Sequence, residues 1–127
     1  MDLNKITAED LMVKDLITIG LEDKIALADL MMTRNNIGGL PVVEKSKLMG
    51  IITQRDVMFA RNYEVGGLRV GELMSRDLVT VAPETSLNEI LRLMLERKIE
   101  RIPVVKNGAL LGLIVHARVL KAVRDSL

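Results

Sequence analysis

The chain contains the same pattern twice. Residues 8–65 align with residues 70–127 at a fixed offset of 62 positions and without a gap, and 16 of the 58 aligned pairs are identical. Repetition of this kind indicates a structural unit that buries its apolar face only by packing on its copy. Two copies are too few for a solenoid, so we expect a pair of units related by a pseudo-two-fold axis. The identical stretches include Leu11-Met12 with Leu73-Met74, and Pro41-Val42-Val43 with Pro103-Val104-Val105.

The composition restricts the functions open to the chain. With 127 residues, it is long enough for about one domain with its own apolar core. It contains no cysteine, which excludes disulfides and thiolate metal sites. The formal net charge is +1, so no strong electric field favours nucleic acid or a membrane surface. Phe59 and Tyr63 are the only aromatic residues, so the sequence lacks the stacked aromatic platforms of single-strand-binding proteins.

The sequence shows no sign of a targeting or membrane-spanning segment. Its first residues do not form the basic stretch and apolar run of a secretory signal peptide. It also contains no run of about 18 apolar residues, the length needed to cross a bilayer. We therefore expect a soluble, cytoplasmic protein.

The first copy predicts an initial helical turn, three strands and two helices. Thr7-x-x-Asp10 is a capping box that opens the helical turn. Asp23 is placed to cap a helix over about 24–35, where apolar residues recur at helical spacing. Asn35 and Asn36 are expected to end that helix. The remaining elements are a strand over 16–19, a hairpin of strands 40–43 and 48–52 around a polar turn, and a helix from Gln54 to about Asn62.

The second copy predicts the same order of elements. Ser86-x-x-Glu89 is the capping box of its first helix, and Asn107-Gly108 is a tight turn between two strands. The elements are a strand over 78–81, a helix over about 86–97, strands 102–105 and 109–115, and a helix over about 116–125. We therefore predict a mixed α+β fold of two pseudo-symmetric β-α-β-β-α repeats. The repeats are assigned to residues 1–65 and 66–127, with a connector from Tyr63 to Leu68.

One segment, Gly50-Ile51-Ile52-Thr53-Gln54-Arg55-Asp56, combines groups that bind nucleotides. It predicts a strand that runs directly into a helix, and the unpaired amides at a helix start attract phosphate. Gly50 permits close backbone approach, Thr53 supplies a hydroxyl, and the Asp56 carboxylate can accept hydrogen bonds from a ribose 2′,3′-diol. Thr53-x-x-Asp56 is equally a capping box that needs no ligand. The residues alone leave both interpretations open.

The order of elements and three short motifs resemble the cystathionine-β-synthase (CBS) domain. The motifs are Leu-Met-x-x-Asp-Leu at 11–16 and 73–78, Pro-Val-Val in both copies, and the segment from Gly50 to Asp56. Two such domains in tandem resemble a Bateman module, and the resemblance covers about residues 7–125. It implies a stand-alone pair of CBS repeats without an attached catalytic domain. It also implies a non-enzymatic protein with no catalytic cofactor and no metal.

In the CBS family, a ligand site combines the Thr/Asp segment of one copy with the first strand and the pre-proline stretch of the other. The resemblance implies an adenosine-type ligand, either AMP, ADP or ATP or an S-adenosylmethionine-like compound. Arg101 matches a position at which family members often place a phosphate-contacting base, whereas the carboxylate of Glu100 disfavours a triphosphate. The residues assigned to this site are Gly50, Ile51, Ile52, Thr53, Arg55, Asp56, Leu78, Val79, Thr80, Ile99, Glu100, Arg101, Ile102 and Pro103.

We expect the second site of the pair to be degraded. In place of Thr53 and Asp56, the second copy has Val115 and Arg118. The valine side chain forms no hydrogen bond and arginine has only donors, so neither accepts from a ribose diol, although arginine can meet a phosphate. Gly38 and Gly39 offer this site no side chain beyond Cα. The residues assigned to it are Ile17, Thr18, Gly38, Gly39, Pro41, Val115, His116 and Arg118.

The expected function is that of a regulatory sensor. Ligand binding would favour one arrangement of the two copies and so change a dimer or the surface offered to a protein partner. In Bateman modules the last helices of the copies tend to form a dimer, and an apolar stripe left in water is an association site. We therefore predict a homodimer. The apolar residues on these helices are Val57, Met58, Phe59, Val119, Leu120 and Val123.

The sequence agrees less well with other functions than with a sensor. The main alternative is a ligand-free dimerisation or protein-interaction scaffold in which Asp56 only caps a helix. Nucleic-acid binding through Arg97, Lys98 and Arg101 is disfavoured by the near-neutral charge and the low aromatic content. His116 is the only histidine, which excludes a multi-histidine metal site, and no serine or threonine stands near it in a catalytic arrangement.

Overall fold

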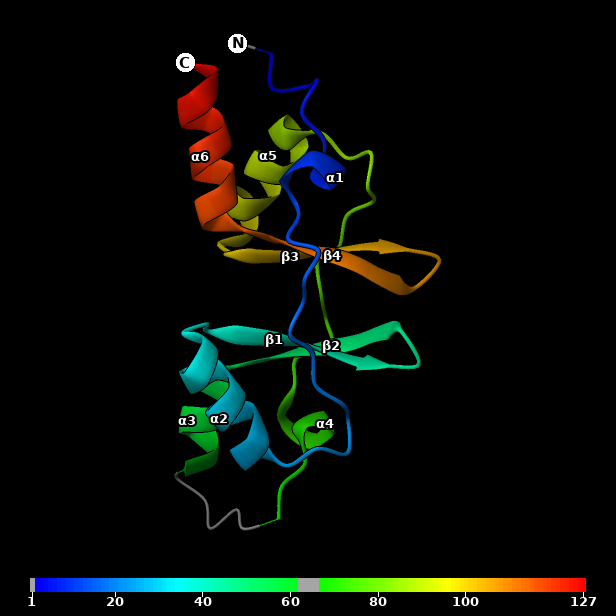
Figure 1. The fold of residues 1–127 in the computed structure, drawn as a ribbon, viewed down its shortest axis with the longest axis vertical. Helices are drawn as coiled ribbons and strands as arrows, with labels where there is room; N and C mark the ends of the chain where they lie inside the picture. Colours follow the sequence, from blue (N-terminus) through cyan, green and yellow to red (C-terminus); the bar gives the residue numbers. More distant parts are fainter. Residues whose placement is uncertain (1, 62–66) are drawn as a thin grey trace. The chain divides into compact units, whose positions relative to one another are not determined.

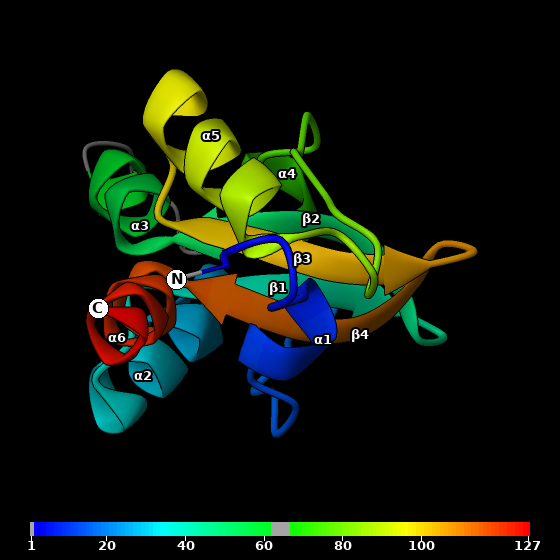
Figure 2. The same cartoon turned by 90° about the horizontal axis from the view of Figure 1, so that it is seen from above.

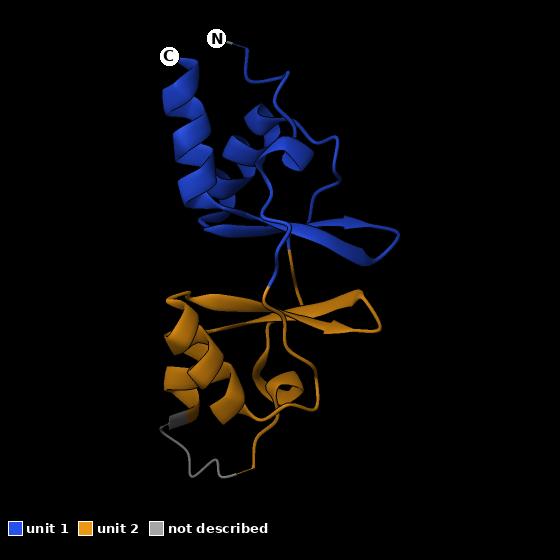
Figure 3. Cartoon of the chain, viewed as in Figure 1, with its two compact units in different colours: residues 1–16, 79–127 blue, residues 17–78 orange. Residues whose placement is uncertain are grey.

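The computed structural model of the chain describes residues 2–61 and 67–127, so most of the predicted connector lies outside the described residues. The chain divides into two compact units, which Figure 3 distinguishes by colour. Unit 1 comprises Met1–Leu16 and Val79–Leu127, and unit 2 comprises Ile17–Leu78. The unit boundaries therefore differ from the boundaries of the sequence repeats.

The difference arises because the repeats exchange their first segments. Helix α1 (Ala8–Leu11), from the first repeat, belongs to unit 1, and helix α4 (Val70–Leu73), from the second repeat, belongs to unit 2. In unit 1 the N–H of Ala8 donates to the carbonyl of Thr85 at 2.8 Å. In unit 2 the N–H of Val70 donates to the carbonyl of Asp23, also at 2.8 Å. Each unit is thus completed by a segment from the other repeat.

Unit 2 contains a β-hairpin with helices on one face (Figure 1). Its other elements are α2 (Ile25–Asn35), β1 (Gly39–Glu44), β2 (Lys47–Thr53) and α3 (Gln54–Arg61). Lys45 and Ser46, which join the strands, have φ values of 50° and 68°. Left-handed backbone at both positions is typical of a type I′ turn, which matches the twist of a hairpin. This confirms the predicted hairpin.

Unit 1 has the same design. Its elements besides α1 are α5 (Leu87–Arg97), β3 (Arg101–Lys106), β4 (Ala109–Val115) and α6 (His116–Ser126). The predicted turn at Asn107-Gly108 is confirmed, with φ values of 53° and 81°. The helices lie on one face of the hairpin in Figure 1, and Figure 2 shows α1 next to β4. In both hairpins the pairing register shifts at one place, between Val42 and Val43 and between Val104 and Val105.

In place of the strands predicted over 16–19 and 78–81, the structure has one isolated β-bridge in each segment. Ile19 donates to the carbonyl of Pro41 at 3.1 Å and accepts from the N–H of Val43 at 2.9 Å, which makes one parallel bridge to β1. The next bond of a parallel ladder would require an N–H from Pro41, and proline has none. The bridge from Val81 to β3 is confined in the same way by Pro103.

The prediction that Asp23 caps the second helix is wrong. The N-cap of α2 is Lys24, whose side chain makes no capping hydrogen bond. The Asp23 carboxylate instead accepts the N–H of Gly20 at 2.8 Å and so closes the preceding turn. Aspartate favours both turns and caps because its short side chain reaches nearby backbone amides in either place.

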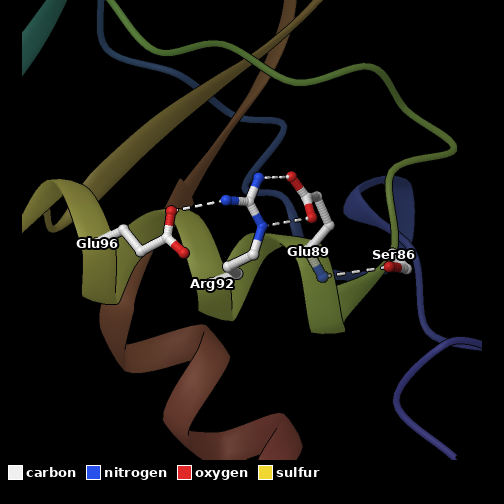
Figure 4. Close-up of polar contacts among 4 residues, drawn as sticks. All are labelled: Ser86, Glu89, Arg92 and Glu96. Carbon is white, nitrogen blue, oxygen red and sulfur yellow. Dashed lines mark hydrogen bonds and ion pairs between the residues drawn. The ribbon is translucent and has the colours of Figure 1, made fainter.

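Helix α5 confirms half of its predicted capping box. The Ser86 hydroxyl accepts the N–H of Glu89 at 3.2 Å. The Glu89 carboxylate does not return to the cap, because it pairs with the guanidinium of Arg92, which also binds Glu96 (Figure 4). The predicted ending of α2 is confirmed as well, since Asn36 caps it in the left-handed region at φ 53°. Lys98 has the equivalent position after α5, at φ 54°.

Each unit has an apolar core, and each core includes the exchanged segment. Buried Val70 and Met74 lie in the core of unit 2, and buried Leu11 lies in the core of unit 1. Fully burying one large aliphatic side chain stabilises a fold by about 1.5–3 kcal/mol. The exchange therefore contributes to the stability of both units. The largest fully buried side chains include Met32, Leu40 and Ile52 in unit 2, and Leu87, Ile90, Ile102 and Ile114 in unit 1.

Candidate functional site

The candidate site in unit 2 is the junction at which β2 passes into α3. The strand ends at Thr53 and the helix begins at Gln54, with no intervening loop. Thr53 donates its N–H to Asp56 Oδ2 at 2.8 Å and its hydroxyl to the same oxygen at 3.0 Å. The N–H of Asp56 donates back to the Thr53 hydroxyl at 3.3 Å. The pair thus forms a complete capping box at the start of the helix.

The capping box fixes the direction of the Asp56 carboxylate. Both side-chain hydrogen bonds end on Oδ2, and within the described residues Oδ1 accepts none. Both Thr53 and Asp56 are partly buried. The capping role, which the sequence left as one of two interpretations, is therefore present, and it leaves one carboxylate oxygen with acceptor capacity.

The start of α3 offers fewer unpaired amides than the sequence suggested. The N–H of Gln54 donates to the carbonyl of Gly38 at 3.0 Å, and the N–H of Asp56 is used in the capping box. The bond between Gln54 and Gly38 forms because the neighbouring residues, Thr53 and Gly39, are paired in the hairpin. Two of the first three amides of the helix are thus satisfied by the protein itself.

Gly50 has a packing role. A Cβ atom at this position would lie 2.6 Å from Met74 Sδ and 2.6 Å from the carbonyl oxygen of Ser75. The next residue, Ile51, exchanges two backbone hydrogen bonds with Ser75 at 3.0 and 2.9 Å, which hold the two segments together. The close approach that glycine permits here is made by the segment after α4. Ile52 points into the core and is fully buried.

The equivalent junction in unit 1 lacks a side-chain cap. Strand β4 passes into α6 at Val115, which makes no capping hydrogen bond. The N–H of His116 donates to the carbonyl of Glu100 at 3.0 Å, as Gln54 does to Gly38 in unit 2. His116 and Arg118 are exposed. The two helix starts therefore differ in local geometry, since α3 has a capping box and α6 has none.

The other predicted site residues are distributed over both units. In unit 2, Gly38 and Gly39 lie against Thr53 and Gln54, although the sequence assigned them to the degraded site. The register of the hairpin sets this contact, and the role of the two glycines in the second site stays a prediction. Ile17, Thr18 and Leu78 also belong to unit 2, whereas Val79, Thr80, Ile99, Glu100 and Arg101 belong to unit 1 together with buried Ile102 and Pro103.

Arg101 begins β3, and its backbone pairs with Val115 in the hairpin. Its side chain is partly buried, whereas Glu100 is exposed. Within residues 2–61 and 67–127, no group of three or more histidine, aspartate or glutamate side chains is placed to hold a metal ion. In the same ranges, every helix is too short or too polar to cross a membrane.

Comparison with known proteins identifies both repeats. Residues 8–63 and 70–125 each match the family model described as the CBS domain. The chain is 43% identical over 108 residues to inosine-5′-monophosphate dehydrogenase of Korarchaeum cryptofilum, covering 84% of this chain and 22% of that enzyme. It is 32% identical over 110 residues to the CBS domain-containing protein YhcV of Bacillus subtilis, covering 85% of this chain and 79% of that protein.

A solved structure with the same fold contains a nucleotide. CBSX2 in complex with AMP superposes with a TM-score of 0.85 at 26% identity, covering 95% of this chain and 98% of that chain. The mixed α+β fold is thereby confirmed as that of paired CBS repeats. The chain spans about a fifth of the length of the dehydrogenases that it matches, so the similarity to them is limited to that part of each enzyme.

Proposed function

Because this chain belongs to the CBS domain family, we propose that it is a non-enzymatic regulatory module that binds an adenosine-type ligand through Thr53 and Asp56. The observation that carries the proposal is the Asp56 carboxylate, which is held through Oδ2 while Oδ1 accepts no hydrogen bond from the described residues. The complex of the related CBSX2 with AMP supports an adenine nucleotide as the ligand class.

The fixed carboxylate suits a ribose. A 2′,3′-diol presents two adjacent hydroxyl donors, and a charged acceptor binds them about twice as strongly as a neutral one. The capping bonds hold the Asp56 side chain in place before a ligand arrives, so less conformational entropy is lost on binding. Capping and ligand binding are therefore compatible roles of the same residue.

The resemblance to the CBS family also implies roles for Arg101 and Glu100, which belong to unit 1. Arg101 is proposed to contact the phosphate, because a guanidinium pairs with phosphate oxygens through two parallel hydrogen bonds. Glu100 carries a negative charge next to it, which opposes the accumulation of phosphate charge. We therefore favour AMP, adenosine or an S-adenosylmethionine-like compound over ATP.

We further propose that the module acts as a homodimer whose arrangement responds to the ligand. The surface residues differ in part from those predicted, because Val57 and Val119 are buried at 3% and 2% exposure. The helix pair of unit 2 instead exposes four large apolar side chains, and α6 of unit 1 exposes one. Those of unit 2 are Leu27, Leu30, Met58 and Phe59, and that of unit 1 is Leu120.

Thermal unfolding with added ligand tests the proposal. A ligand at a hundredfold excess over its dissociation constant stabilises the folded state by about 2.7 kcal/mol, which raises Tm by several degrees for a chain of this size. AMP, adenosine, ATP and S-adenosylmethionine should be compared on the full chain. Absence of a shift with all four compounds contradicts the proposal.

A matched variant separates the two roles of Asp56. Asp10 accepts the N–H and the hydroxyl of Thr7 at 2.9 and 3.1 Å, which repeats the Thr53–Asp56 arrangement at α1. Asp10→Ala should therefore lose a similar cap and keep the ligand-induced rise in Tm, whereas Asp56→Ala should lose both. A ligand-induced rise in Tm that survives Asp56→Ala contradicts the proposed contact with Asp56, and absence of any rise in the unchanged chain indicates the ligand-free scaffold described above.

A further inference from the structure

Unit 2 contains a surface cavity that shares no residue with the Thr53–Asp56 junction. Its volume is about 270 Å³, and it lies where α4 meets the turn before α2. Its lining combines two uncharged residues, Leu21 and Gly71, with four charged residues that are exposed to solvent. The residues that line it are Leu21, Glu22, Arg69, Gly71, Glu72 and Arg76.

Hydrogen bonds hold three of the lining residues, Gly71, Glu72 and Arg76, in place. The N–H of Gly71 donates to the carbonyl of Leu21 at 2.9 Å, which ties α4 to the turn. Arg76 Nη2 donates to the carbonyl of Gly71 at 3.1 Å, so this guanidinium is anchored next to the cavity. The backbone N–H of Arg69 donates to Glu72 Oε1 at 3.0 Å, which positions that carboxylate.

The charged groups of the cavity do not neutralise one another by direct ion pairs. Within the described part of the chain, neither Arg69 nor Arg76 forms a salt bridge with Glu22 or Glu72. Arg76 uses one of its donors on the backbone, and a guanidinium has five. The residues that line the cavity therefore include positively charged hydrogen-bond donors and negatively charged hydrogen-bond acceptors, and both kinds can bind a ligand.

The internal duplication shows that this set of residues is particular to unit 2. At the aligned positions, unit 1 has a threonine in place of Arg69, a glutamate in place of Gly71 and a lysine in place of Arg76. The aligned set carries three acidic groups and one basic group, whereas the set in unit 2 carries two of each. The aligned residues are Thr7, Glu9, Asp10, Lys14, Pro83 and Glu84.

We propose that this cavity binds a small zwitterion that carries one acidic and one basic group, such as a free amino acid. The two guanidiniums match a carboxylate, and the two carboxylates match an ammonium group. A polyanion is disfavoured, because Glu22 and Glu72 would repel it at short range. Gly71 permits the close contact with Leu21 in the lining, since a Cβ at this position would lie only 3.1 Å from Leu21 Cδ2.

Nuclear magnetic resonance on the full chain labelled with ¹⁵N tests this proposal. Each proteinogenic L-amino acid is titrated in turn while the amide signals of Gly71 and Arg76 are followed. We expect at least one amino acid to shift these signals saturably, with half-saturation on the order of 1 mM, because the surrounding charges are exposed to solvent. Failure of every amino acid to produce a saturable shift overturns the proposal.

A matched variant tests the role of the guanidinium. Arg69→Thr introduces the residue found in unit 1 and creates a Thr-x-x-Glu capping box with Glu72, so the fold should be kept. We expect this variant to weaken the binding of the amino acid at least tenfold. Unchanged binding by Arg69→Thr contradicts the proposal.

Simple ions and a second variant complete the test. Inorganic phosphate and acetate supply only the acidic group, and methylammonium supplies only the basic group. An equally strong saturable shift with any of these ions would show an anion or cation site instead of a zwitterion site. Asp56→Ala should leave amino-acid binding unchanged, so failure of the nucleotide proposal and failure of this one are distinguishable.

Discussion

Asp56 Oδ2 accepts the backbone N–H of Thr53 at 2.8 Å, and this bond joins the end of β2 to the first turn of α3. The Thr53 hydroxyl approaches the same oxygen at 3.0 Å. Oδ2 thus stabilises the start of the helix, and the proposed ligand would bind Oδ1. Substitutions of Asp56 should change helix stability and ligand affinity by different amounts, so the two roles can be separated by experiment.

We predict that Asp56→Asn separates stability from ligand affinity. Asparagine retains an oxygen that can accept the N–H of Thr53, and the neutral amide of glutamine is also accepted at this third position of a capping box. The free energy of unfolding should therefore stay close to that of the unchanged chain, whereas Asp56→Ala should lower it by about 1 kcal/mol. Urea denaturation measures both values.

The same Asp56→Asn variant should bind AMP more weakly. The neutral amide forms weaker hydrogen bonds with ribose hydroxyls than the carboxylate does. Calorimetric titration at constant salt measures the affinity. An unchanged affinity for AMP would contradict the proposed contact between Asp56 and the ribose.

We predict that the missing cap of unit 1 can be restored. Val115→Thr together with Arg118→Asp places the Thr-x-x-Asp pattern of α3 at the start of α6. The new cap should raise the free energy of unfolding by about 1 kcal/mol, because it satisfies backbone amides at the helix start. Arg118→Ala serves as the control, since an exposed position contributes little. A double variant no more stable than the control would show that α6 gains nothing from a cap.

We predict that Gly50→Ala destabilises the chain. The added Cβ would lie 2.6 Å from Met74 Sδ and from the carbonyl oxygen of Ser75, and the backbone oxygen cannot rotate away. Overpacking of this kind costs about 1–3 kcal/mol. Gly67→Ala is the matched control, because no atom of the residues that the structure describes lies within 4 Å of a Cβ at that position. Chemical denaturation of both variants should give a loss for Gly50→Ala and little change for Gly67→Ala.

The sequence predicted most of the fold because its signals were local. Turn residues, capping boxes and apolar periodicity indicated the two hairpins and the helices that follow them. The strand over 16–19 was overestimated because its length depends on a distant partner, Pro41, which has no N–H for a second bridge. The exchange of α1 and α4 was not predictable from the repeat pattern. Both segments begin with equivalent motifs, so the alignment does not say which unit each one completes.

The candidate site shows the same limit. The sequence identified the Thr53–Asp56 pair and its double interpretation, and the geometry confirmed the cap. The sequence could not show that the carbonyl of Gly38 accepts a hydrogen bond from the N–H of Gln54, since that contact depends on the register of the hairpin. The role of Gly50 likewise depends on Met74 and Ser75, which are more than 20 residues away in the sequence.

We predict a small acid-dependent loss of stability from the charged face of α5. The hydrogen bond from Arg92 holds the pKa of Glu89 below its ordinary value of 4.5. A carboxyl group whose pKa is lowered by folding adds stability that is present above the unfolded pKa and is lost as pH falls through the folded pKa. Replacing Arg92 by methionine should therefore lower Tm at pH 6 and have little effect near pH 2. Because Glu89 and Arg92 are exposed, the difference should also shrink in 1 M salt, which reduces the screening length to about 3 Å. A variant with the same deficit in Tm at both pH values would show that Arg92 stabilises α5 through packing of its aliphatic stem and not through Glu89.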